Sequence, residues 1–109
     1  MRKTDKKIEN ALRIALTEAC DMALESYEGF MWLTHLVNYK NFPDSLSIVC
    51  VFDTNEQLSR ANVEALRAII QQKLASIDIS LKDIRQHVSF DTEENCEREN
   101  NGKWHERLK

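Results

Sequence analysis

Two aspartates are candidates for chemistry because each directly follows an apolar, strand-like run. Asp53 follows residues 46–52, and Asp91 follows the shorter run that ends at Phe90. If these runs form neighbouring parallel strands, both carboxylates lie at the carboxyl edge of one sheet, where open α/β sheets usually hold ligands. There they could bind Mg²⁺ or act as a general base in a metal-dependent hydrolase. The favoured interpretation is that both aspartates help to cap the helices that follow.

A histidine and a cysteine form a second candidate. The predicted hairpin places His35 opposite Cys50, and such a pair can form a thiolate nucleophile or half of a metal site. Both are expected in the core, and no further pair of ligands has zinc-like spacing. The sequence has no P-loop, glycine-rich dinucleotide turn, serine elbow or HExxH motif. We therefore expect no enzyme, no cofactor and no metal site.

The elements that would position these residues begin with a long amphipathic helix. Apolar residues recur at helical spacing between charged ones, which predicts a helix over about residues 5–26. Thr4 or Asp5 is placed to cap its start. Gly29 is free to take the left-handed conformation that ends it.

Two apolar runs on either side of a turn predict a β-hairpin. If residues 41–44 form the loop, Leu33 faces Phe52 and His35 faces Cys50 on one side, which is almost wholly apolar. A slip of one residue would mix the two faces, so the pattern favours this alternation. The core strand is therefore residues 46–52, with Ile48, Cys50 and Phe52 directed inward.

The second half of the chain repeats the pattern of a strand followed by a helix. A helix is predicted over residues 55–76, with Thr54 and Gln57, or Asp53 and Glu56, as a capping box. A short strand over 86–90 and an acidic helix over 92–99 follow. The fold class is α/β (α+β), in the order α-β-β-α-β-α, with a three-stranded mixed sheet and helices mainly on one face. We expect a single domain over residues 1–109, with residues 1–4 and 103–109 as candidate flexible tails.

The other face of the hairpin carries an apolar patch. We define this patch by Trp32, Leu36, Val49 and Val51, which are too many apolar residues to leave exposed without reason. Either the C-terminal segment folds back, with Trp104 and Leu108 covering the patch, or a second subunit covers it. A non-catalytic binding protein that forms a homodimer, or binds a protein partner, through this face is the leading functional hypothesis.

A basic segment at the start of the chain supports an alternative. The net charge of −3 argues against unspecific nucleic-acid binding, but it leaves room for a local basic patch. Lys3, Lys6, Lys7 and Arg13 form such a patch on the first helix. The element order over residues 5–91 resembles the KH-like topology of some bacterial ribosome-associated proteins, although the GxxG loop of true KH domains is missing. The alternative is an RNA- or ribosome-associated accessory protein.

Several motifs together resemble one protein group. They are residues 32–39, Asn41-Phe42-Pro43, Val51-Phe52-Asp53-Thr54, residues 87–91 and Trp104. On these residues the chain resembles a group of short uncharacterised proteins from gamma-proteobacteria with no established activity. The resemblance implies a bacterial cytoplasmic protein. A cytoplasmic location without a membrane span also fits the three widely spaced cysteines and the absence of a secretory signal or a long apolar run.

Overall fold

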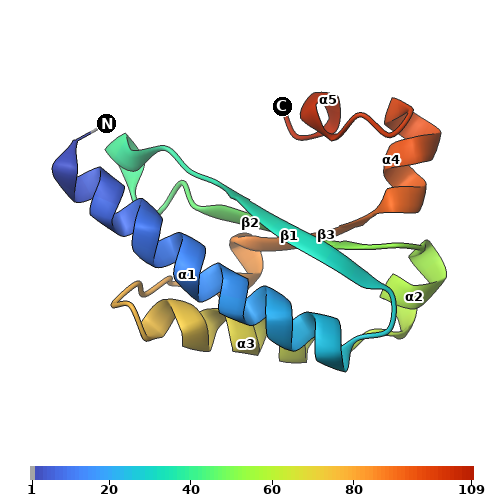
Figure 1. Ribbon diagram of the computed structural model, residues 1–109, viewed down its shortest axis with the longest axis horizontal. Coiled ribbons are helices and arrows are strands. Elements are labelled where there is room, and N and C mark those ends of the chain that lie inside the picture. Colours follow the sequence, from blue (N-terminus) through green and yellow to red (C-terminus); the bar gives the residue numbers. More distant parts are fainter. Residues whose placement is uncertain (1) are drawn as a thin grey trace.

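A computed structural model describes residues 2–109 as a three-stranded sheet with helices on both of its faces (Figure 1). Met1, the first residue of the predicted domain, lies outside the described residues. The elements follow one another as α1 (Lys3–Ser26), β1 (Phe30–Leu36), the 3-10 turn η1 (Tyr39–Asn41), β2 (Ser47–Phe52), α2 (Asn55–Arg60), α3 (Val63–Ala75), the 3-10 turn η2 (Ile84–Gln86), β3 (Val88–Thr92), α4 (Glu93–Asn100) and α5 (Trp104–Arg107).

The sheet is mixed, as the sequence predicts. β2 lies in the middle, pairs with β1 in antiparallel fashion and pairs with β3 in parallel fashion. The parallel pairing requires a long crossover, which α2 and α3 provide. The predicted fold class and central strand are therefore confirmed. The element order differs from the predicted one in two places: the second helix is divided into α2 and α3, and α5 lies in residues 103–109, which were predicted as a candidate flexible tail.

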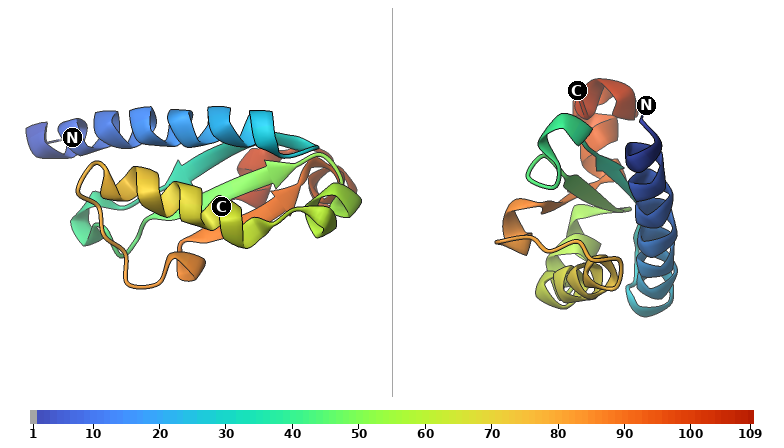
Figure 2. Two further views of the ribbon diagram at one scale, coloured as in Figure 1. Left: turned by 90° about the horizontal axis from the view of Figure 1, so that it is seen from below. Right: turned by 90° about the vertical axis from the view of Figure 1, so that its left-hand side faces the viewer.

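The core lies between the sheet and the two long helices. α1 and α3 lie side by side on one face, and α4 and α5 lie on the other side of the sheet (Figures 1 and 2). The inward residues of β2 are Ile48, Cys50 and Phe52, and none of them is exposed. They pack against the apolar stripes of both helices, whose buried members are Leu12, Leu16, Ala19, Ala23, Leu66, Ile70 and Leu74.

The hairpin has the predicted faces but not the predicted register. His35 lies opposite Ile48, and Leu33 lies opposite Cys50, so the pairing is shifted by two residues. The loop is longer than expected, because Asn38 caps the turn η1 and also bonds Ser45 across the loop. A shift of two keeps the side-chain alternation, which explains why the faces survive.

The second helix is divided, which corrects the prediction of one helix over 55–76. The capping box of Thr54 and Gln57 starts α2, as predicted, but α2 ends at Arg60. Asn62 then accepts a hydrogen bond from the Ala65 backbone amide and starts α3. The break provides α3 with a side-chain cap, and the chain changes direction between the two helices.

Two further boundaries differ from the predicted ones. α1 starts at Lys3, with Arg2 at the cap position and no side-chain hydrogen bond there, so neither Thr4 nor Asp5 is the cap. β3 extends to Thr92 and therefore includes Asp91. Gly29 takes the predicted left-handed conformation, but α1 ends earlier, at Ser26, with Tyr27 as an extended cap residue. At the end of α4 the cap residue itself, Asn101, is left-handed.

Candidate functional site

The two aspartates that were considered as a metal site lie in different surroundings. Asp91 pairs with Val51 inside the sheet, whereas Asp53 lies beyond the end of β2 and is exposed. Arg107 approaches Asp91 with two nitrogen atoms, at 2.5 and 3.0 Å, and the Thr92 amide donates to the same carboxylate at 2.8 Å. Burial opposes ionisation of Asp91, but these donors outweigh it and lower its pKa. The Asp91 carboxylate is thus held by a cation of the same chain.

The segments that link β2 to α2 and β3 to α4 contain these aspartates and are joined to each other by hydrogen bonds. Thr54 and Thr92 cap the helices that follow, so the interpretation of Asp53 and Asp91 as the caps is wrong by one residue at each junction. Asn55 bonds the side chains of Thr92 and Asn95, each at 2.8 Å. The Glu94 amide also donates to the Asp53 carbonyl at 3.0 Å. These contacts fix the carboxyl edge of the sheet. Among residues 2–109, no three His, Cys, Asp or Glu side chains are grouped so as to hold a metal ion.

His35 does not lie opposite Cys50 but binds Glu9 of α1. The His35 Nε2 atom lies 3.1 Å from Glu9 Oε1, and the Tyr39 hydroxyl donates to the other oxygen of the same carboxylate. The hydrogen bond from Tyr39 is the main cause of a lowered pKa at Glu9. Burial and the bond to Glu9 raise the pKa of Tyr39. Burial likewise raises the pKa of the Cys50 thiol to about 12, so Cys50 carries no thiolate at neutral pH.

The apolar patch is largely covered by the chain itself. Val51 is not exposed at all, Val49 is 7% exposed, and Leu36 remains 43% exposed. Trp104 of α5 lies edge-on to Trp32, with ring centroids 4.8 Å apart. Both indole nitrogens donate to Glu93, at 2.7 Å from Trp32 and 3.2 Å from Trp104. Of the two covers considered for the patch, the C-terminal segment is the one seen in the single chain, where Trp104 packs on Trp32.

Charge is distributed unevenly along the molecule. The first turns of α1 and the turn η1 carry cations that form no salt bridge with any residue from 2 to 109; these are Lys3, Lys6, Lys7, Arg13 and Lys40. Both segments lie at the same end of the molecule (Figures 1 and 2). We call this region the basic end. Its two α1 carboxylates are already engaged, because Asp5 pairs with Arg2 at 3.5 Å and Glu9 binds His35 and Tyr39.

The opposite end is acidic. Beyond its middle, α1 carries Glu18, Asp21 and Glu25, and α4 is rich in glutamate. The net charge of −3 therefore averages a cationic region and a larger anionic one. A polyanion would be attracted to the first and repelled by the second, so the charge pattern favours one orientation on such a ligand.

A pocket of about 270 Å³ opens at the basic end. Three segments form it: the start of α1, the loop after η1 and the loop after α3. Its lining is mainly apolar and consists of Lys7, Ile8, Ala11, Phe42, Ile77, Asp78 and Ile79. Lys3 lies one helical turn before Lys7, and so on the same side of α1. An apolar pocket thus borders a row of unpaired lysines.

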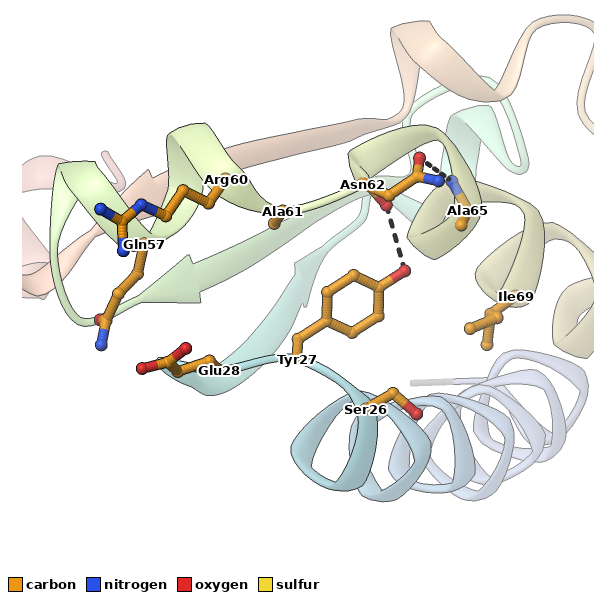
Figure 3. A pocket seen from close by; sticks show the side chains of 9 residues that line it. All are labelled: Ser26, Tyr27, Glu28, Gln57, Arg60, Ala61, Asn62, Ala65 and Ile69. Atoms are coloured by element: carbon orange, nitrogen blue, oxygen red, sulfur yellow. Dashed lines mark hydrogen bonds between the residues drawn. The ribbon is translucent and has the colours of Figure 1, made fainter.

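A second pocket, of about 470 Å³, lies at the break between α2 and α3 (Figure 3). The Tyr27 hydroxyl crosses it and donates to the Asn62 carbonyl at 3.1 Å. Its two charged side chains are Glu28 and Arg60, and Arg60 already pairs with Glu56 at 2.5 Å. This pocket lacks the unpaired cations of the basic end.

No family model, curated protein or solved structure matches this chain. None of the helices among residues 2–109 has both the length and the apolar character needed to cross a membrane. The arguments for function therefore come from the geometry and charge described above.

The sequence predicted one part of the basic end and missed the other. Lys3, Lys6, Lys7 and Arg13 are the predicted candidates for nucleic-acid contact, and the structure places them on α1 with no ion pair to any described residue. Phe42, Asp78 and the isoleucines of the pocket were not candidates, because they belong to loops whose positions depend on the tertiary fold. One signal was available: Phe42 follows Lys40 in a turn, and aromatic residues beside lysines are typical of single-strand binding surfaces.

Proposed function

We propose that the protein is a non-catalytic RNA-binding accessory protein whose basic end contacts the RNA backbone. The observation that carries this proposal is the gathering of Lys3, Lys6, Lys7 and Lys40 at one end of the molecule, where none of them forms an ion pair with another of residues 2–109. Lysines that contact phosphates release condensed counterions, and this release supplies much of the affinity for nucleic acids.

The topology supports the same proposal. The core has the order α-β-β-α-α-β, in which α2 and α3 together form the crossover between the parallel strands β2 and β3, and β1 is antiparallel. Its order of helix, hairpin, helical crossover and strand resembles that of KH-like domains. The chain has only two glycines, Gly29 and Gly102, so it lacks the GxxG loop that clamps phosphates in true KH domains. In this proposal the lysine side chains of α1 take over the contact with phosphate.

The test is a comparison of two lysine-to-glutamine variants. Lys3, Lys6 and Lys7 are changed together in the first, and Lys103 and Lys109 in the second. Binding of fluorescent single-stranded RNA of about ten nucleotides is measured by anisotropy at low salt. We expect the first variant to lose most of its affinity and the second to bind nearly as the native chain does. Absence of binding by the native chain at low salt would overturn the proposal.

A homodimer, or a complex with a protein partner, is the second candidate. The exposure of Leu36 at 43%, on the edge strand β1, favours it. Val49 and Val51 are covered within the chain, however, so docking on the full patch requires α5 to move. Light scattering after size-exclusion chromatography tests this candidate: a dimer of the native chain that Leu36→Asp dissociates supports it, and a monomer at high concentration contradicts it.

A further inference from the structure

The pocket at the basic end has a mainly apolar lining and a volume of about 270 Å³. Ile8, Phe42 and Ile77 are partly buried against the hydrophobic core, so this wall of the pocket is held in place by packing. The Phe42 ring also packs on Tyr39, with centroids 5.9 Å apart and an angle of 31° between the rings. Tyr39 is in turn fixed to Glu9 of α1. The aromatic wall is therefore preformed.

The charges around the pocket select its occupant. Lys7 and Asp78 line it with opposite charges, and Lys3, one turn away on the same side of α1, makes the net charge around it positive. An apolar group that enters here is therefore favoured when it is attached to an anionic chain. A nucleobase on a phosphodiester backbone has both properties, and bases stack on aromatic side chains in single-strand binding proteins. In a duplex the bases are already stacked and paired, so only a single strand can present one.

We propose that the pocket formed by Lys7, Phe42, Ile77 and Asp78 receives one unstacked base of single-stranded RNA. This inference rests on the proposed RNA-binding function and adds to it the substrate class and a base preference. Phe42 provides the stacking surface, and Lys7 contacts an adjacent phosphate.

Asp78 determines which base the pocket prefers. It is exposed, and its carboxylate forms no hydrogen bond or salt bridge with another side chain in the described part of the chain, so its acceptor oxygens are free. Its φ of 62° lies in the left-handed region, which Asp and Asn adopt more readily than most residues. A carboxylate accepts hydrogen bonds from the exocyclic amine of cytosine, whereas uracil presents a carbonyl oxygen at that position. The pocket therefore favours cytosine over uracil.

Three RNA homopolymers of about ten units test the proposal, because a homopolymer removes uncertainty about register. They are oligocytidylate, oligouridylate and an abasic ribose-phosphate oligomer. Each is titrated against the native full-length chain, Phe42→Leu and Asp78→Asn. Tyr27→Leu, an aromatic-to-leucine change at the pocket between α2 and α3, serves as the control, and thermal unfolding verifies that each variant is folded.

We expect oligocytidylate to bind more tightly than oligouridylate, and the abasic oligomer to bind most weakly. Phe42→Leu should weaken oligocytidylate binding by about five- to a hundredfold and leave the abasic oligomer unaffected. Asp78→Asn should remove most of the preference for cytosine. Tyr27→Leu should change neither the affinity for oligocytidylate nor the preference for cytosine over uracil.

Equal binding of base-containing and abasic oligomers by the native chain would overturn the proposal that the pocket receives a base. It would leave the proposed RNA-binding function standing. This comparison needs only the native chain, so it decides whether a base is bound even if Phe42→Leu does not fold. Loss of the cytosine preference in Tyr27→Leu but not in Asp78→Asn would also overturn it. If none of the oligomers binds the native chain at low salt, the RNA-binding function itself fails.

Discussion

Lys7 and Phe42 line the same pocket although they belong to different elements, one to α1 and the other to the loop after η1. The bond from Tyr39 to Glu9 fixes η1 against α1, and Phe42 follows η1 directly. An unpaired cation and an aromatic ring are thus placed side by side by the packing of the loop on the helix. This relationship links the fold to the proposed contact with RNA.

The first prediction concerns salt. For single strands, the slope of log K against log salt concentration changes by about 0.7 for each phosphate contact. Replacing Lys3, Lys6 and Lys7 with glutamine should therefore reduce the slope by about two if each lysine contacts one phosphate. Binding measured over a series of salt concentrations gives the slope. An unchanged slope in this variant, with Lys103 and Lys109 intact, would place the phosphate contacts elsewhere.

The second prediction concerns the carboxylate that holds η1. Glu9→Gln should lower the free energy of unfolding by about 1–2 kcal/mol, because Glu9 binds both His35 and Tyr39 through charge-assisted hydrogen bonds. Glu18→Gln is the matched control on the same helix. Its partner is Lys73 at an exposed site, so a change below about 0.5 kcal/mol is expected. Urea denaturation measures both; equal effects would contradict the role of Glu9.

Tyr39 should report on the same cluster at high pH. Burial and the bond to Glu9 raise the pKa of its phenol above the ordinary value of 10. The stabilisation linked to this group is complete below pH 10 and is lost as the pH rises through the folded pKa. In Glu9→Gln the phenol pKa should move back toward 10. Difference absorbance of phenolate formation, with Tyr39→Phe as the reference, tests this shift; an unchanged titration would contradict the contact.

The fourth prediction concerns acid stability. Arg107→Leu should destabilise the fold by about 1–3 kcal/mol, because it leaves the mostly buried Asp91 carboxylate without its cation. The folded pKa of Asp91 is lowered, so its contribution is complete above the ordinary value of 3.8 and is lost as the pH falls through the folded pKa. The difference in unfolding free energy between the native chain and the variant should therefore shrink in acid. A difference that stays constant with pH would contradict the ion pair.

The fifth prediction concerns the cover of the apolar patch. Trp104→Ala removes the ring that packs on Trp32 and should cost about 1–3 kcal/mol. The newly exposed patch should also promote self-association, which light scattering detects. His105→Ala, a change at an exposed residue of α5, is the control. If Trp104→Ala remained as stable as the native chain, α5 would not be the cover.

Local patterns were sufficient for the fold but not for the exact pairing. The alternation along β2 placed Ile48 and Cys50 in the core, because which face a side chain takes depends only on parity. The register of β1 also depends on loop length, and the turn η1 could not be read from single residues. The division between α2 and α3 is not predicted, because Ala61 fits the apolar periodicity of one continuous helix. Asn62 caps α3 only because the chain bends there, and the sequence pattern does not show that bend.

The candidate site was predictable only where it lies on a regular element. Helical spacing places Lys3 and Lys7 on one side of α1 whatever the rest of the chain does. Phe42 and Ile77 line one pocket because two irregular loops lie beside the same helix, and no short sequence pattern encodes that arrangement. Glu9 is an intermediate case, since it lies beside the apolar stripe of α1, where a polar residue facing a strand needs a partner.

The most direct test of the RNA contact is an NMR titration of the isotopically labelled native chain with single-stranded oligocytidylate at low salt. The proposal predicts amide shift changes confined to the basic end, in residues 2–13, 39–42 and 77–79, with little change in α4. Changes centred on Leu36 and α5, or none at all in the presence of excess RNA, would contradict it.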